Sequence, residues 1–417
     1  MMNQPHLYQL LICRSLLRDE LLQTLDAFIE TPSDNEAKYD FASRLIDTAE
    51  ALGLSGNLLQ SYLLYRLIND ENTVARCIET NKGKLSPSLR EAFRHDIKIL
   101  APLLREKPSS FRAPALLDDY EPTVPQTTTG VAYLSTFMER GWTPETLADT
   151  LIDYYFRFGC GVISKHRAFR WSKTEGLVGI KHFEPIQFKD LIGYMSQKKQ
   201  LQSNTLAFLS GRPANNVLLV GARGTGKSSS VKALANEYFV QGLRLVQITK
   251  PQLVELPQIM NALRRYASKH FIIFLDDLSF NDDETEYKYL KSTIEGGVEA
   301  RPDNVLIYAT SNRRHLIKET WRDREAGQDE LYMAESMNET ISLSDRFGLI
   351  INYRMPNQNE YLAIIDYHLR AAGVLLPPEE LRVLGKQWEL EHSGRSGRTA
   401  QQFVAHYLGQ VHAAAQK

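Results

Sequence analysis

Two patterns of hydrophobic residues divide the chain. Over roughly the first hundred residues, apolar side chains recur every three or four positions, as at Leu17, Leu21 and Leu25. This is the spacing of one buried face of an amphipathic helix. From about residue 183 the pattern changes to short, nearly continuous apolar runs that alternate with amphipathic segments. Such runs are typical of strands that are buried on both faces of a parallel sheet. The pattern therefore predicts a helical N-terminal region followed by an α/β region.

Five apolar runs supply the expected strands. The amphipathic segments between them are long enough to be the helical crossovers that parallel strands require, so a doubly wound, five-stranded parallel sheet is predicted. After about residue 357 the chain is again helical in pattern. The predicted strands are 216–221, 243–249, 271–277, 304–312 and 348–355.

Local signals suggest where the domains begin and end. The stretch 107–130 is rich in Pro, Ser and Thr and lacks periodicity, so it is predicted to be a linker. Thr143 and Pro144 form a favourable helix start, and this helix should stop near Gly159. The predicted organisation is a helical N-terminal domain (1–106), a linker (107–130), a helical connecting segment (131–182), an α/β domain (183–356) and a C-terminal helical lid (357–417).

Composition narrows the protein class only slightly. The 417 residues are 43% hydrophobic and 24% charged, which is typical of a soluble globular protein, and the formal net charge of -1 does not suggest an obligatory polyanionic partner. The cysteines Cys13, Cys77 and Cys160 form no disulfide or zinc pattern, which suits a reducing cytoplasm. No run of about 18 apolar residues is present, so no membrane span is expected.

One segment carries a strong chemical signal. GARGTGKS (221–228) fits G-x-x-x-x-G-K-[ST] at every position, directly between a predicted strand and a predicted helix. Glycines let backbone N–H groups turn inward towards phosphate oxygens, and the helix N-terminus adds its positive dipole end. The lysine can reach the β- and γ-phosphates of ATP, and the serine hydroxyl can bind Mg²⁺. The predicted nucleotide-binding residues here are Gly221, Ala222, Arg223, Gly224, Thr225, Gly226, Lys227, Ser228 and Ser229.

A second signal is the pair of aspartates that ends the strand predicted at 271–277. Carboxylates at the end of a buried strand require a cationic partner, because an unpaired charge there is costly. Asp276 is therefore predicted to organise Mg²⁺ together with Ser228, and Asp277 to polarise the attacking water. The alternative interpretation is that both residues simply begin a solvated acidic loop.

These segments, in this order, resemble the AAA+ superfamily of ATPases over about residues 183–417. The resemblance implies a P-loop α/β domain with a C-terminal helical lid. PIQFKDLIG (185–193) resembles the segment that packs against the adenine, which implies nucleotide contacts from Ile192 and Gly193. More narrowly, the chain resembles an uncharacterised bacterial family of single-module AAA+ proteins with an N-terminal helical region.

The resemblance also implies residues for hydrolysis. YATSN is similar to sensor 1, which makes Asn312 the residue that contacts the γ-phosphate or the attacking water. SLSDRFG is similar to the motif that carries an arginine finger, and Arg346 occupies that place. SGRSGRTAQQF resembles sensor 2, with Arg398 as the best match and Arg395 as the alternative. Each of these residues also has a simpler interpretation, as a turn cap or a surface arginine.

Two departures from the superfamily pattern bear on function. Asp277 stands where a glutamate is usual, and the helix after the second strand lacks the aromatic-apolar-glycine pore loop of protein unfoldases. Threading of polypeptides is therefore not expected. Segment 161–200 carries eight Lys/Arg against three Asp/Glu with interleaved aromatic residues, which suits either a nucleic-acid backbone or packing at the entry to the module.

The favoured interpretation is a cytoplasmic, Mg²⁺-dependent AAA+ ATPase that switches a partner protein through its N-terminal helical domain. A finger that acts on a neighbouring subunit implies a homo-oligomer. The alternative is a weakly hydrolysing loader or adaptor that acts with a nucleic-acid-processing partner. A third hypothesis is a scaffold that nucleotide only stabilises.

Overall fold

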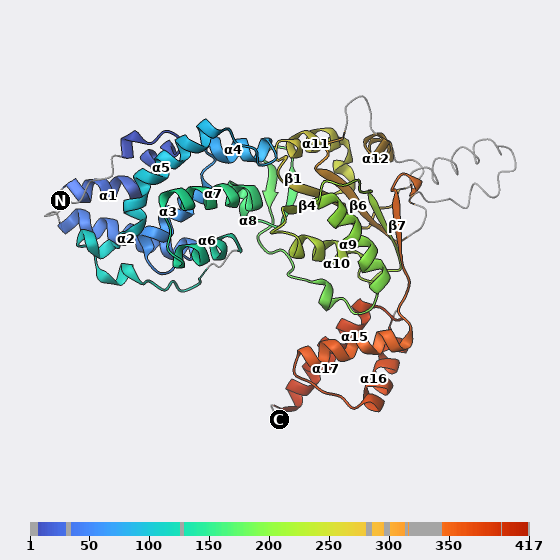
Figure 1. The fold of residues 1–417 in the computed structure, drawn as a ribbon. Coiled ribbons are helices and arrows are strands. Elements are labelled where there is room, and N and C mark those ends of the chain that lie inside the picture. Colours follow the sequence, from blue (N-terminus) through green and yellow to red (C-terminus); the bar gives the residue numbers. More distant parts are fainter. Residues whose placement is uncertain are drawn as a thin grey trace. The chain divides into compact units, whose positions relative to one another are not determined.

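The computed structural model separates the chain into two compact units (Figure 1). The first comprises residues 1–166 and 265–269, and the second comprises 167–264 and 270–417. Within them the structure describes residues 7–30, 35–125, 129–280, 286–295, 301–312, 316, 344–392 and 394–415.

The first unit is helical, as its amphipathic pattern predicts. Polar caps define its helix starts: Asn57 and Ser86 accept hydrogen bonds from N–H groups of the first turn, and Pro87 follows Ser86. Thr143 caps its helix as predicted, and that helix ends before Gly159, which has φ +83°. The helices are α1 (Glu20–Glu30), α2 (Asn35–Leu52), α3 (Leu58–Asn69), α4 (Thr73–Thr80), α5 (Pro87–Arg105), α6 (Thr129–Glu139), α7 (Pro144–Phe158) and α8 (Gly161–Lys165), with single 3₁₀ turns η1 (Leu7–Gln9), η2 (Arg14–Arg18), η3 (Pro108–Phe111) and η4 (Ala115–Asp118).

Residues 107–125 of the stretch predicted to be a linker are folded onto this unit. Leu117 in η4 is fully buried, and Asp118 accepts hydrogen bonds from the backbone and side chain of Ser109. Tyr120 forms a backbone bridge with Gly56. Proline and serine serve here in 3₁₀ turns with tertiary contacts, which local composition does not distinguish from a free linker.

This packing predicts a stability effect that a linker residue would not show. Leu117→Ala is expected to lower the free energy of unfolding by about 2–5 kcal/mol, because it leaves a cavity in a closed core. Leu116→Ala is the matched control, since Leu116 is 55% exposed and its loss should change stability little. Urea denaturation of both variants measures their free energies of unfolding. Equal values for the two variants would mean that 107–125 behaves as a linker.

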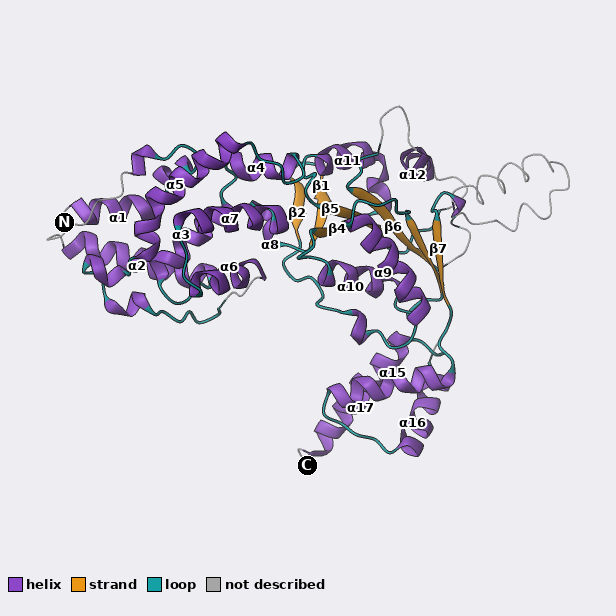
Figure 2. Ribbon diagram, in the orientation of Figure 1, coloured by secondary structure: helices purple, strands orange, loops and turns teal. Residues whose placement is uncertain are grey.

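The second unit is built on one seven-stranded sheet of order β2-β1-β4-β5-β6-β3-β7 (Figure 2). Its pairs are parallel except for β1 with β2. The strands are β1 (Ala168–Ser172), β2 (Gly176–Gly179), β3 (Val217–Gly221), β4 (Leu243–Ile248), β5 (His270–Leu275), β6 (Val305–Ser311) and β7 (Leu349–Tyr353).

The predicted doubly wound α/β fold is confirmed, with seven strands in place of five. The five predicted runs are β3 to β7, and the two further strands lie in 131–182, which was expected to be helical throughout. β1 and β2 were not predicted as strands because both are short and because β2 begins and ends with a glycine, Gly176 and Gly179. They join the sheet because β1 pairs in parallel with β4 and forms a hairpin with β2.

Alternate residues of the strands face opposite layers of helices. Leu219 and Tyr308 belong to a core shared with the helices that precede and follow β3, while their neighbours Leu218 and Ile307 are equally buried but point to the other face. Near-continuous apolar strands are the consequence. The helices of this α/β part are α9 (Met195–Leu209), α10 (Lys227–Glu237), α11 (Leu256–Arg264) and α12 (Glu286–Glu295), with η5 (Phe188–Asp190) and η6 (Lys250–Glu255).

Three helices after β7 form a lid with a core of its own. Tyr361 and Ile365 pack with Ala400 and Phe403, and all four are buried. The helices are α15 (Gln358–Ala371), α16 (Pro378–Glu391) and α17 (Gly397–Ala415). Among the described residues, no helix is both long and apolar enough to cross a bilayer.

Candidate functional site

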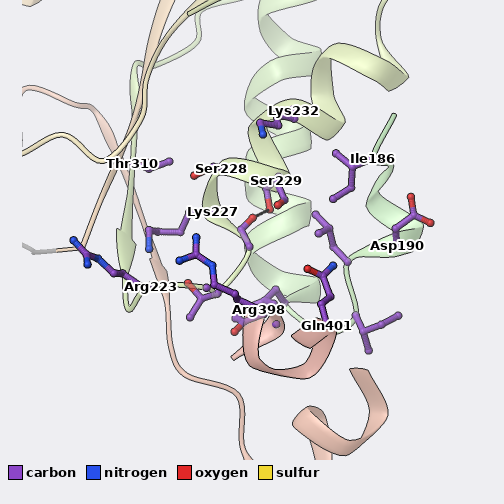
Figure 3. A pocket seen from close by; sticks show the side chains of 18 of the residues that line it. Ile186, Asp190, Arg223, Lys227, Ser228, Ser229, Lys232, Thr310, Arg398 and Gln401 are labelled. Carbon is purple, nitrogen blue, oxygen red and sulfur yellow. Dashed lines mark hydrogen bonds between the residues drawn. The ribbon is translucent and has the colours of Figure 1, made fainter. Parts of the chain in front are cut away.

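A pocket of about 620 Å³ lies where β3, β5 and β6 end and α17 begins (Figure 3). The carboxyl ends of parallel strands are the usual place for ligands in open α/β sheets. Residues from the P-loop, the acidic strand end, the sensor 1 strand and the lid share this cavity. Its lining includes Arg223, Gly224, Thr225, Gly226, Lys227, Ser228, Ser229, Asp276, Asp277, Thr310, Asn312 and Arg398.

The P-loop has a backbone that only glycine permits at its first position. Gly221 has φ +151°, and a Cβ there would lie 2.0 Å from the carbonyl oxygen of Tyr353 on the adjacent strand β7. Gly224 and Gly226 also have positive φ, and Gly226 is the N-cap of α10. The loop therefore turns tightly from β3 into α10 and presents a helix N-terminus to the pocket.

Lys227 is the central cation of the pocket and is 6% exposed. Its Nζ donates to the carbonyl oxygens of Gly221 and Ala222, both at 2.7 Å, and to Oδ1 of Asn312 at 3.2 Å. Burial lowers the pKa of Lys227, while the charges of Asp277 and Asp276 oppose that shift. The ammonium group is thus held at the base of the loop by neutral carbonyl oxygens.

Sheet order explains how the acidic residues meet the P-loop. β6 lies between β5 and β3, so the acids that follow β5 are one strand removed from the P-loop. Asp276 Oδ1 accepts hydrogen bonds from Ser228 Oγ at 2.5 Å and from Thr310 Oγ1 at 2.7 Å. The structure therefore brings together the two residues predicted to organise the metal ion.

Asp277 has an uncommon backbone conformation. Its φ is +54°, a left-handed value that costs on the order of 1–3 kcal/mol for a residue other than glycine. The amide of Asn312 donates to its carboxylate, and Arg223 lies 3.8 Å away in an exposed ion pair. Asn312 thus bridges Lys227 and Asp277, the cation and the acid predicted to act at the γ-phosphate.

The lid contacts the P-loop directly. The N–H of Gly397 donates to the carbonyl oxygen of Gly224 at 2.8 Å, and a Cβ on Gly224 would lie 2.8 Å from the Ser396 hydroxyl. Arg398, in the first turn of α17, lines the pocket. Arg395 instead forms an ion pair with Glu389 at 2.6 Å, so Arg398 is the arginine placed at the nucleotide pocket.

Apolar side chains also line the pocket. Ile186, Leu191 and Ile192 line it from the segment before α9, and Ile364 lines it from the lid. Lys198 holds that segment in place, because its Nζ donates to the carbonyl oxygens of Phe188 and Leu191. Apolar walls of this kind suit the faces of a nucleobase.

Some predicted residues lie outside the lining of this pocket. Gly193 has φ +82° and turns the chain into α9, while Gly221 and Ala222 shape the loop through backbone contacts. Arg346 is half-buried in the turn before β7, at the amino-terminal end of that strand. Because the pocket lies at the opposite, carboxyl-terminal edge of the parallel strands, Arg346 is on the far edge from its own P-loop.

Several lining residues were not predicted as site residues, among them Lys198, Thr310 and His368. Lys198 and His368 belong to no local motif that marks a nucleotide site. Thr310 lies within YATSN, two residues before Asn312, so its place on the same strand face was the one available signal.

The oxygen atoms near Ser228 fit a magnesium ion. Mg²⁺ in nucleotide sites uses one or two protein oxygens together with phosphate oxygens and water. Ser228 Oγ and Asp276 Oδ1 provide such a pair, already within hydrogen-bonding distance of each other. Among the described residues no cluster of three or more His, Cys, Asp or Glu side chains could hold a metal by protein ligands alone.

Known proteins similar to this chain include an ATP-dependent zinc metalloprotease. The chain is 26% identical over 179 residues to the ATP-dependent zinc metalloprotease FtsH of Aquifex aeolicus (strain VF5), a match that covers 36% of this chain and only 28% of that protein. A solved structure of a Thermotoga maritima RuvB mutant is 15% identical, with a TM-score of 0.39 over 56% of this chain and 68% of that one. Another, titled RuvB Holliday junction branch migration motor, is 16% identical with a TM-score of 0.33, and covers 54% of this chain and 72% of that one.

The family assignment rests on a broader match. The model of the family described as "Protein of unknown function (DUF815)" matches residues 164–411, which is more than half of the chain. This chain belongs to that family, and its nucleotide-binding module is an AAA+ module.

Proposed function

We propose that this protein is an Mg²⁺-dependent ATPase of the AAA+ type, in which nucleotide state is passed to the lid and to a partner. One observation carries the proposal: a single pocket combines the P-loop, the acid pair Asp276 and Asp277, Asn312 and a lid arginine. A purely structural glycine-rich turn would not need these side chains at the same cavity. Their chemistry matches what phosphoryl transfer requires, namely cations at the phosphates and an acid at the water.

Each group has a distinct part in the proposed reaction. The backbone N–H groups and Lys227 bind the β- and γ-phosphates, and Arg398 adds a permanent charge from the lid. Bound Mg²⁺ would neutralise charge on the phosphate oxygens, held through Ser228 and Asp276. Asp277, oriented by the Asn312 amide, positions the water for in-line attack on the γ-phosphorus and accepts its proton.

The same contacts suggest how hydrolysis acts at a distance. Gly397 and Arg398 at the start of α17 lie directly on the P-loop and the pocket, so a change at the phosphates alters what the lid touches. In this proposal the lid and a homo-oligomeric assembly pass the change to a protein partner of the helical unit. The relatives' own substrates are not part of the proposal, since the FtsH match spans 28% of that protein.

Substitution of the two acids tests this assignment. Asp276→Ala is expected to lose Mg²⁺-dependent ATP binding, whereas Asp277→Asn should bind ATP normally and lose about 10²-fold or more in turnover, the scale of general acid–base catalysis. Asp303→Asn is the matched control, an exposed acid just before β6 at the opposite edge of the sheet. Phosphate release and ATP binding with and without Mg²⁺ are the measurements.

Two other results would change the proposal. Equal, mild effects of both substitutions on turnover would contradict the separate roles of the acids. Turnover that is detected only with added DNA or RNA would support the loader or adaptor instead.

A further inference from the structure

The hydroxyl group of Thr310 forms hydrogen bonds with both acids of the site. Thr310 is 1% exposed on β6, donates its proton to Asp276 Oδ1 at 2.7 Å and accepts the backbone N–H of Asp277 at 2.9 Å. A hydroxyl has one proton to donate, so this proton is not available to another acceptor. One buried side chain therefore fixes the carboxylate of one acid and the backbone of the next.

The main chain of Thr310 adds a third contact. Its carbonyl oxygen accepts the N–H of Leu278 at 2.7 Å, so Thr310 binds three consecutive residues after β5. Asp277 lies in the middle of this segment with φ +54°. A left-handed aspartate persists only where neighbouring contacts define its conformation. Thr310 supplies two of these contacts, and the direction of the Asp277 carboxylate depends on them.

The sheet register explains why Thr310 can contact the segment that contains both acids. Ala309 is level with Leu275, the last residue of β5, so Thr310 is level with Asp276. On the other side Thr310 pairs with Leu219 of β3, two residues before the P-loop glycine Gly221. A polar side chain at this point of the intermediate strand reaches the acids from a rigid element.

Ser228 alone cannot hold Asp276 in this way. Its Oγ donates to the same carboxylate oxygen, but it is also the oxygen that the proposed ATPase uses to bind Mg²⁺. An Oγ that turns towards a metal ion must reorganise its hydrogen bond. The Thr310 hydroxyl makes both of these hydrogen bonds within the acidic segment, so its bond to Asp276 can persist through the cycle.

We propose that Thr310 is a positioning residue that keeps the metal-organising Asp276 and the water-orienting Asp277 in a fixed relation. This inference rests on the proposed ATPase function and assigns a supporting residue to it. Side chains that orient metal-site carboxylates typically change metal affinity or activity by about 10- to 100-fold when they are removed.

Thr310→Val and Thr310→Ser test the proposal as a pair. Valine keeps the shape and removes the hydroxyl, so kcat should fall and the Mg²⁺ concentration for half-maximal ATP binding should rise, each about 10- to 100-fold. ATP binding without Mg²⁺ should stay within about twofold, because Lys227 and the P-loop backbone are untouched. Serine keeps both hydrogen bonds and should restore kcat and Mg²⁺ dependence to near the parent values.

Thr205→Val controls for the loss of a buried hydroxyl. Thr205 on α9 is fully buried, and its Oγ1 bonds the Tyr308 hydroxyl of the same strand, away from the acids. Thr205→Val should alter the stability of the protein without altering the Mg²⁺ dependence of ATP binding. Parent-like kcat and Mg²⁺ dependence in Thr310→Val would overturn the proposal, as would a loss that serine does not restore. If the parent itself shows no turnover, the ATPase proposal fails, and the Mg²⁺ dependence of ATP binding still decides the role of Thr310.

Discussion

Lys227→Ala is expected to weaken ATP binding by at least about 30-fold. Truncation of a charged partner in a desolvated site costs about 2–5 kcal/mol, and every 1.4 kcal/mol is a factor of about ten in Kd. Lys227 is buried at the base of the P-loop, and its three polar contacts are neutral oxygens of Gly221, Ala222 and Asn312. Asp276 keeps its hydrogen bonds from Ser228 and Thr310, and Asp277 keeps the Asn312 amide, so the fold should persist.

Fluorescent-nucleotide titration measures the affinity, and thermal unfolding without nucleotide checks the fold. Lys386→Ala on α16 serves as control, because Lys386 is exposed and lies away from the pocket lining. If Lys227→Ala binds Mg·ATP as the parent does, the pocket is not a P-loop nucleotide site.

Arg346→Ala should bind ATP normally and hydrolyse it about 10³-fold more slowly or worse, the scale reported for arginine fingers. Its position supports action on a neighbour. Leu349 pairs with Val217, whereas Tyr353 pairs with Gly221 of the P-loop. These two pairs lie roughly 13 Å apart along the strands, at about 3.3 Å per residue. Arg346 precedes the far pair, so its guanidinium is remote from the phosphates bound by its own chain.

Mixing distinguishes a finger from a surface arginine. Arg346→Ala and Lys227→Ala subunits should together regain turnover that neither has alone, because each supplies the group that the other lacks. Turnover of the parent should also rise more steeply than linearly with protein concentration in the range of assembly. A parent that stays monomeric under every nucleotide condition, with unchanged turnover in Arg346→Ala, would contradict the trans assignment.

The sequence by itself determined those elements whose functional residues are adjacent in the chain. GARGTGKS contains its turn, its glycines and its helix start within eight residues, so the loop could be predicted without tertiary information. The five strands β3 to β7 were equally accessible, because each is a nearly continuous apolar run in the sequence. The resemblance to AAA+ proteins followed from the order of these motifs, and the family match and the fold confirm it. The roles of all the site residues, Lys227 and Asp276 as well as Asp277, Arg346 and Arg398, stay predictions.

Only the tertiary structure decided which separate segments become neighbours. β1 and β2 form strands because β1 pairs with β4. Residues 107–125 are folded because Leu117 is buried against the helical unit. Thr310 contacts Asp276 and Asp277 because β6 lies between β5 and β3 in the sheet. In the sequence, Thr310 follows Asp276 by 34 positions and Asp277 by 33 positions. Hydrogen bonds depend on distances of about 3 Å in space, and a one-dimensional pattern carries no such distances between strands.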